Sequence, residues 1–108
     1  MTYSLNDVIL VKYPFSDLSH TKIRPAVVIH SPLPTLDLFI VPLTSKTEML
    51  LDGEFVLSHW AEAGLNVTTA VKRGIYTIHH SLVIKTIGSL SDHDADQLKK
   101  AIKLWLNL

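Results

Sequence analysis

The stretch that decides the fold runs from Asp7 to Ile29 and reads DVILVKYPFSDLSHTKIRPAVVI. Apolar and β-branched residues fill Asp7–Tyr13 at its start and Ala26–His30, which extends one residue past its end, and runs of this kind predict β-strands. The polar segment between them, Pro14–Ile23, contains turn-forming Asp and Ser residues and is interpreted as a loop. The N-terminal quarter therefore predicts two strands joined by a polar loop.

Downstream of this stretch, further short apolar runs alternate with turns. One segment, Ser58–Leu65, has the composition of a single helical turn closed by Gly64. The others are predicted strands at Leu36–Leu43, Glu54–Leu57, Asn66–Lys72, Ile75–Ile78 and Leu82–Leu90. Six or seven short strands separated by turns favour a small antiparallel barrel or sandwich.

The last segment changes to a helical period. Ser91 is a good N-cap, and Asp94 three residues later makes a weak form of the capping box. The predicted buried face carries Ala95, Leu98, Ile102 and Trp105. Three more leucines lie off that face, at 104, 106 and 108. They indicate either a second interface or a simple apolar overhang.

Composition excludes several classes of protein. The 108 residues, expected to form one domain over 1–108, include 10 Lys+Arg, 10 Asp+Glu and no Cys, and 47% are hydrophobic. The chain is too apolar to be disordered, and it can have neither disulfides nor a Cys nucleophile. Its zero net charge means that any basic site must be created by folding. With no apolar run near the roughly 20 residues of a membrane span and no signal-peptide pattern, we expect a cytoplasmic protein that does not enter membranes.

The six histidines do not predict a metal site. None has the helical i, i+4 spacing of a zinc protease, and His79 and His80 would face opposite sides of a strand. We therefore expect neither a metal nor another cofactor. His20 is different because it shares a polar segment with Lys22 and Arg24, which makes it a candidate for acid–base chemistry.

Two segments carry groups that suit a phosphate. Arg24 stands before Pro25, which favours an extended backbone, and its guanidinium is a permanent planar donor. Taken alone, it is more simply interpreted as a surface Arg that covers a sheet edge. Thr44 and Ser45 follow the third predicted strand, where a pair of hydroxyls either caps a turn or binds a ligand.

A second basic cluster lies further along the chain. Lys72 and Arg73 precede Gly74, where phosphate contacts and a solvated turn are both open. Tyr76 offers a ring on which a base could stack.

The order of these pieces resembles one family. The strings DVILV (7–11), PFSDL (14–18), RPAVVI (24–29), VPLTS (41–45) and IGSLS (87–91) are similar to those of the MazF/PemK/Kid toxins, over residues about 6 to 104. The resemblance implies an SH3-like antiparallel β-barrel with a C-terminal helix, as in MazF and CcdB toxins, and a homodimer. It implies metal-independent cleavage of single-stranded RNA, including mRNA, to 2′,3′-cyclic phosphate and 5′-hydroxyl ends. It also implies a cognate antitoxin that covers the RNA site.

The family motifs fall on particular residues of this chain. The Arg of the R-P pair is Arg24, and the hydroxyl of the P-x-T-S string is Thr44. His20 matches a polar loop position less tightly and is the third expected catalytic residue. The expected RNA-binding residues are Lys22, Ser45, Lys46, Lys72, Arg73 and Tyr76.

Two alternatives stay open, the first because of a departure from the family pattern and the second because of the apolar C-terminal end. Some relatives carry a carboxylate that acts as the catalytic base in the strand that corresponds to Val71–Ile78. In this chain, Val71–Ile78 contains no Asp or Glu. The chain could therefore be a non-catalytic barrel that binds RNA or protein. It could also be a gyrase-type toxin, similar to CcdB, that acts through its apolar C-terminal end.

Overall fold

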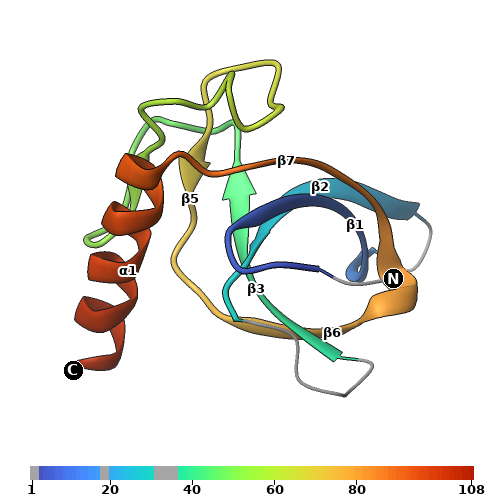
Figure 1. Cartoon of the computed structure of the whole chain (residues 1–108). Helices are drawn as coiled ribbons and strands as arrows, with labels where there is room; N and C mark the ends of the chain where they lie inside the picture. Colours follow the sequence, from blue (N-terminus) through green and yellow to red (C-terminus); the bar gives the residue numbers. More distant parts are fainter. Residues whose placement is uncertain (1–2, 18–19, 31–36) are drawn as a thin grey trace.

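The computed structural model describes residues 3–17, 20–30 and 37–108, and side chains within 13–21 are outside the description. The described elements form one antiparallel sheet and a C-terminal helix (Figure 1). In chain order they are β1 (Asp7–Asp17), β2 (His20–Val28), β3 (Asp37–Thr44), β4 (Phe55–Val56), β5 (Ala70–Val71), β6 (Tyr76–His79), a 3₁₀ turn (His80–Leu82), β7 (Val83–Ser89) and α1 (Asp92–Leu106).

The sheet curls because β3 has more than one antiparallel partner. The strand order is β4-β5-β3-β2-β1-β7, and β6 pairs with the first half of β3 while β5 pairs with its end. The 3₁₀ turn then carries the chain from β6 to β7 on the far side of β1 (Figure 1). The prediction of a mainly antiparallel β fold with a C-terminal helix is confirmed. The barrel is partly open, since no ladder joins β6 to β7 in the described residues.

Alternation along the strands fills two cores, one on each face of the sheet. Ile9 and Val28 point into the curled sheet, where they pack with Val11, Ala26, Leu38, Ile40 and Ile78. Their neighbours Val8 and Val27 face the other way and pack with Leu98 of α1. Since successive strand residues point to opposite faces, this apolar pattern requires both faces of β1 and β2 to be covered.

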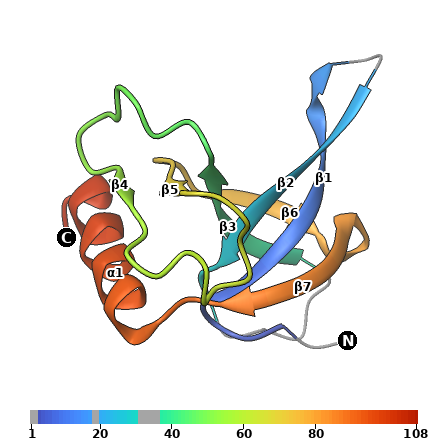
Figure 2. The ribbon, with the colours of Figure 1, turned by 90° about the horizontal axis from the view of Figure 1, so that it is seen from above.

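The prediction of a loop at Pro14–Ile23 is wrong. The ladder of β1 and β2 continues through it, pairing Lys12 with Ile23 and Tyr13 with Lys22. The register shifts between Tyr13 and Asp17, in the part of β1 that contains Pro14. A proline is tolerated in a strand at such an irregularity, where its missing N–H breaks no regular ladder bond. The two strands form a long hairpin whose arms project beyond the body of the sheet (Figure 2).

The helix prediction is confirmed, with one change at its N-terminus. The Ser91 hydroxyl accepts a hydrogen bond from the Asp94 backbone N–H at 3.2 Å, as an N-cap does. The Asp94 carboxylate does not complete a capping box. It is only 1% exposed and accepts hydrogen bonds from the N–H groups of Ser58, at 2.9 Å, and His59, at 2.8 Å. Asp94 thus ties α1 to a segment 35 residues earlier in the chain.

The segment between β4 and β5 is more irregular than predicted. Ser58–Leu65 forms turns, with Gly64 at a φ of +88°, but no helix, and the predicted strand Asn66–Lys72 is reduced to β5. A Cβ on Gly64 would overlap the carbonyl oxygen of Ile87, and one on Gly88 would overlap that of Ala63. The two glycines therefore let this turn lie backbone to backbone on β7.

In the described part of the chain, no helix combines the length and the apolar character needed to cross a bilayer.

Candidate functional site

A groove of about 840 Å³ lies on the outer face of the sheet, between the middle of β2, the end of β3, the turn at 64–67 and β7. Its position follows from the strand alternation of β1. Val8 and Leu10 face the same side, but Val8 is fully buried in the core cluster that includes Leu98 of α1, whereas Leu10 lines the groove. The groove is therefore the part of the outer face that the helix leaves uncovered.

Arg24 stands on one wall of the groove. It belongs to β2, is paired with Val11 of β1, and has an exposed side chain. Its guanidinium donates a hydrogen bond to the Ile23 carbonyl at 3.0 Å, and within the described part of the chain its other N–H groups have no partner. Pairing with β1 holds the backbone at Arg24 in a fixed place, so the cation projects from a rigid strand.

Thr44 is the last residue of β3 and lines the same groove. It pairs with Ala70 of β5. Its hydroxyl oxygen accepts a hydrogen bond from the Lys46 N–H at 3.1 Å. This turn directs the exposed Ser45 and Lys46 along the groove. The structure thus brings together four of the residues predicted from sequence: Arg24, Thr44, Ser45 and Lys46.

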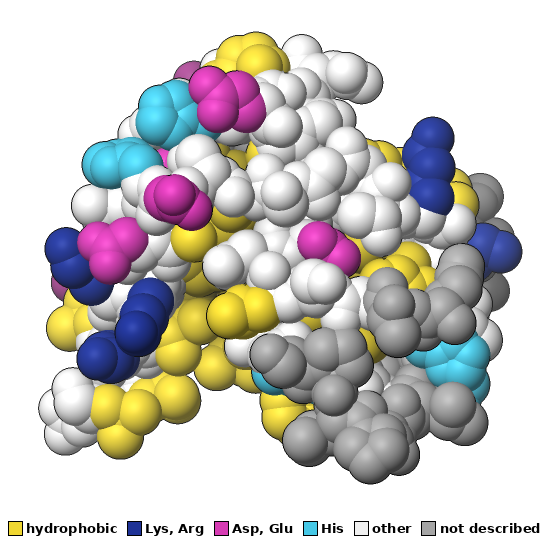
Figure 3. All heavy atoms as spheres, viewed as in Figure 1, with side chains coloured by type: hydrophobic (Ala, Val, Ile, Leu, Met, Phe, Trp, Pro, Cys, Tyr) yellow, Lys and Arg dark blue, Asp and Glu magenta, His cyan; other side chains and the backbone are white. Residues whose placement is uncertain are grey.

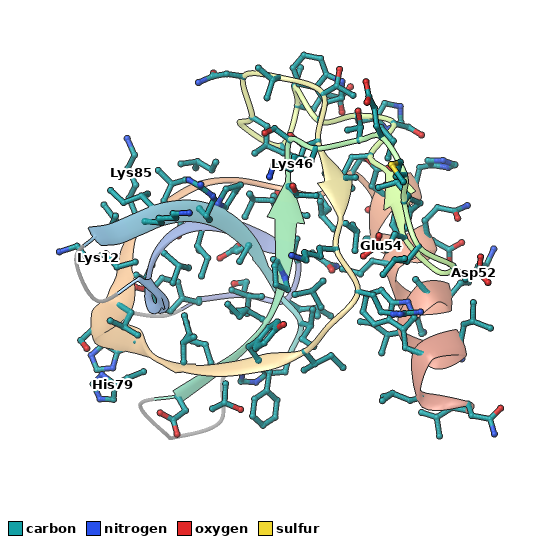
Figure 4. All side chains as sticks on the ribbon, turned by 180° about the vertical axis from the view of Figure 1, so that it is seen from behind. Lys12, Lys46, Asp52, Glu54, His79 and Lys85 are labelled. Atoms are coloured by element: carbon teal, nitrogen blue, oxygen red, sulfur yellow. The ribbon has the colours of Figure 1, made fainter. Side chains whose placement is uncertain are left out.

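Lys85 also lines the groove, and sequence reasoning missed it. It lies on β7 opposite Leu10, and Leu10 lies opposite Pro25 of β2, so one row of residues crosses three strands. Figure 4 shows Lys85 on this side of the barrel, with Lys46 and Lys12. An exposed lysine in a strand is the ordinary solvent-facing residue, so the sequence held no signal for its role.

The groove is positively charged although the chain is neutral. Arg24, Lys46 and Lys85 line it, and no Asp or Glu is among its described lining residues. None of the three forms an ion pair within the described part of the chain. The exposed Lys12 and Lys22 lie beside Ile23, which itself lines the groove, and they extend the basic surface along the hairpin. Folding has created the basic site that the composition lacks.

Lys72, Arg73 and Tyr76 lie outside this groove. The Arg73 N–H donates to Glu54 at 2.8 Å, and its guanidinium donates to the Asp52 carbonyl at 3.3 Å. Arg73 lines a second cleft of about 650 Å³ with Asp52, Gly53, Leu104 and Trp105. Tyr76 is exposed on β6, opposite Ile40 of β3. An RNA-binding role for these three residues stays a prediction.

Glu54 is the carboxylate that holds this second cluster together. Desolvation by burial opposes its ionisation, but hydrogen bonds from the Arg73 and Leu51 N–H groups outweigh that effect. With the positive charges of Arg73 and Lys72, they lower the pKa of Glu54 below its ordinary value. Glu54 therefore stabilises a turn and is not a lining residue of the basic groove.

The histidine predictions have different outcomes. The backbone of His20 lies in β2 opposite Asp17, but its side chain lies outside the described residues, so its catalytic role stays a prediction. The expectation that His79 and His80 face opposite sides of a strand is wrong: β6 ends at His79, His80 begins the 3₁₀ turn, and the centroids of the two rings are 4.6 Å apart. Within the described residues, no three His, Cys, Asp or Glu side chains meet where they could hold a metal ion.

The fold and the groove define a small antiparallel β protein with a basic, hydroxyl-lined site suited to a phosphate. A family model described as the PemK-like, MazF-like toxin of type II toxin–antitoxin systems matches residues 5–106, and the chain belongs to this family. A comparison with curated protein sequences finds no match.

Solved structures show the same fold at low sequence identity. The toxin MazF-mt6 of Mycobacterium tuberculosis is 20% identical, with a TM-score of 0.76 over 94% of this chain and 97% of that one. A mycobacterial endoribonuclease in complex with its cognate antitoxin is 15% identical, with a TM-score of 0.75 over 98% and 96%. MazF in a MazE–MazF complex from Deinococcus radiodurans is 13% identical, with a TM-score of 0.77 over 100% and 99%.

Proposed function

We propose that this toxin is an endoribonuclease that cleaves single-stranded RNA, including mRNA, in the basic groove. The observation that carries the proposal is the meeting of Arg24 and Thr44 in a groove whose described charged residues are all cations. The family supports it, and the mycobacterial structure with the same fold is described as an endoribonuclease. A groove of about 840 Å³ is within the usual size range of ligand sites.

The chemistry uses a nucleophile that RNA itself supplies. The 2′-oxygen attacks the adjacent phosphorus, and its proton passes to a base as the bond between phosphorus and the 5′-oxygen breaks. The leaving 5′-oxygen takes a proton from water, which gives a 2′,3′-cyclic phosphate and a 5′-hydroxyl. Arg24 neutralises the charge that builds up on the phosphate, and the Thr44 hydroxyl donates to a phosphate oxygen to fix the in-line geometry.

The base in this scheme is His20, four residues before Arg24 on β2. The described lining of the groove supplies no carboxylate for the task. An imidazole is well suited because its ordinary pKa lies near neutral pH.

The test is cleavage of a long mixed-sequence RNA in EDTA, with the new 5′-ends mapped by sequencing. We expect cuts at one recurrent short motif. Arg24→Ala should lower the rate by about 10²–10³, because it removes a charge-stabilising donor. The matched control is Lys99→Ala, which removes an exposed cation from α1. RNA that stays intact with the unaltered protein, or cutting by Arg24→Ala at the rate of the unaltered protein, would overturn the proposal.

A gyrase-type toxin remains the second candidate because the C-terminal end of α1 is apolar and exposed. Leu104, Leu106 and Leu108 are 67%, 52% and 86% exposed. Figure 3 shows hydrophobic side chains gathered over this end of the helix. A toxin of this kind would keep its effect on growth after Arg24→Ala and would lose it after substitution of these leucines.

The proposal includes two partners. A cognate antitoxin would neutralise the toxin by covering the basic groove. The mycobacterial endoribonuclease described above is in complex with its cognate antitoxin, and the Deinococcus MazF is in complex with MazE. A second copy of the chain would complete a homodimer, and the exposed leucines of α1 are apolar surface that such an interface could cover.

A further inference from the structure

One wall of the basic groove is an irregular segment that sequence analysis left without a function. Leu65, Asn66 and Val67 line it, next to Gly64. Leu65 is partly buried in the outer core cluster, whereas the side chains of Asn66 and Val67 are exposed to the groove.

This wall has a fixed backbone although it is neither helix nor strand. The Leu65 N–H donates to the Trp60 carbonyl at 3.2 Å, and the Thr69 hydroxyl donates to the Val67 carbonyl at 2.8 Å. The contact of Gly64 with Ile87 holds its start against β7. Asn66 is therefore anchored on both sides, as a specificity-determining residue must be.

The side chain of Asn66 differs in kind from the other polar groups of the groove. Arg24, Lys46 and Lys85 only donate hydrogen bonds, and the hydroxyls of Thr44 and Thr69 already form hydrogen bonds with backbone groups near them in the chain. The amide of Asn66 donates and accepts in one plane, and it has no hydrogen-bond partner in the described part of the chain. Its neighbours Leu65 and Val67 provide apolar surface against which a ring can lie.

We propose that Asn66 reads one nucleobase of the bound RNA and is a specificity-determining residue of the toxin. The inference rests on the proposed function, since the RNA is held by its phosphates at Arg24 and Lys85. Single-stranded RNA presents its base edges to the protein, and a planar amide pairs with an adjacent donor and acceptor on such an edge. The wall at 65–67 thus supplies base discrimination, while the cations supply affinity that is independent of sequence.

The test compares cleavage motifs of the unaltered protein, Asn66→Ala and Asn66→Asp on the same mixed-sequence RNA. We expect Asn66→Ala to lose a preference of about tenfold at one motif position, with cutting retained. Asn66→Asp accepts only, so the preference at that position should move to guanine, which presents two donors on one edge. Glu62→Ala, in the same turn but outside the groove, is the control and should keep the motif.

The inference fails if folded Asn66→Ala keeps the full preference at every motif position. If the unaltered protein does not cut the RNA at all, the proposed endoribonuclease activity is wrong instead. In that case the binding of homopolymeric RNA decamers by fluorescence anisotropy decides the matter. A base preference that disappears in Asn66→Ala would support the inference, and equal binding of all four decamers by the unaltered protein would overturn it.

Discussion

At the scale of residues, the groove obtains its charge from positions where solvent-facing lysines and arginines are ordinary. Arg24, Lys46 and Lys85 come from β2, the turn after β3 and β7. Each is exposed and none forms an ion pair in the described part of the chain. Because neighbouring like charges repel, their concentration at one site carries an electrostatic cost that an anion would relieve.

Substitution of Lys85 tests whether the cations of the groove bind the phosphates of RNA. Lys85→Gln should weaken the binding of a short single-stranded RNA to a similar degree for every sequence. The slope of log K against log salt concentration should fall in magnitude by about 0.7, the value for one lost phosphate contact on a single strand. Fluorescence anisotropy titrations at several salt concentrations measure this slope.

The control for Lys85 is Lys99→Gln, which removes an exposed charge of the same kind from α1. An equal loss of salt dependence in both variants would show that overall charge, and not the groove, binds the RNA.

At the scale of elements, local patterns predicted what local interactions determine. The apolar and β-branched runs around Val8–Val11 and Ala26–Val28 predicted the centres of β1 and β2, and Ser91 with the 3.6-residue period predicted α1. The hairpin at Pro14–Ile23 was missed because cross-strand pairing overrode the turn preferences of its residues. The local sequence does not predict the register shift that allows Pro14 to lie within a strand.

The link between the 51–54 turn and the end of β5 depends on the ionisation of Glu54. Since the pKa of Glu54 is lower in the folded than in the unfolded chain, its charge stabilises the fold above about pH 4.5, the ordinary value. This contribution should be lost as the pH falls through the lowered pKa. Glu54→Gln should cost about 1 kcal/mol at pH 7 and progressively less toward pH 3.

Thermal unfolding from pH 3 to pH 7 checks this expectation. Glu48→Gln, at an exposed position of the neighbouring segment, serves as the control. A constant stability difference between Glu54→Gln and the unaltered protein over this range would contradict it.

At the scale of the whole molecule, the groove wall depends on a contact between distant parts of the chain. Gly64 and Gly88 let the turn at 63–67 rest on β7, and either glycine given a Cβ would overlap backbone. Gly88→Ala should therefore destabilise the protein by about 1–3 kcal/mol, as overpacking does, and displace Asn66 and Val67.

Urea unfolding measures that cost, and cleavage mapping shows whether base preference is relaxed along with it. The adjacent exposed Ser89→Ala is the control. An unchanged unfolding midpoint for Gly88→Ala would mean that the two backbones are not held together as described.

The same contact explains which part of the candidate site the sequence could not predict. Arg24 and Thr44 sit in short motifs next to strand ends, so their chemistry is visible locally. Lys85 reaches the groove because β7 pairs with β1, and Asn66 reaches it because Gly64 packs on the backbone of Ile87. Both relations are long-range, and no spacing along the chain reports them.

A neutral molecule with a cationic groove must carry its compensating negative charge elsewhere. In this chain Asp92, Asp94 and Asp96 of α1 are offset by three lysines of the same helix, at 99, 100 and 103. The negative charge that balances the groove therefore lies on carboxylates within residues 1–90, outside the described lining of the groove. The cations are gathered at one place, whereas these carboxylates are not. A polyanion approaching in solution exerts a torque on such a molecule, turning the groove toward the RNA strand before any contact forms. Added salt should slow the encounter by screening this torque, even though the toxin has no net charge for the polyanion to attract.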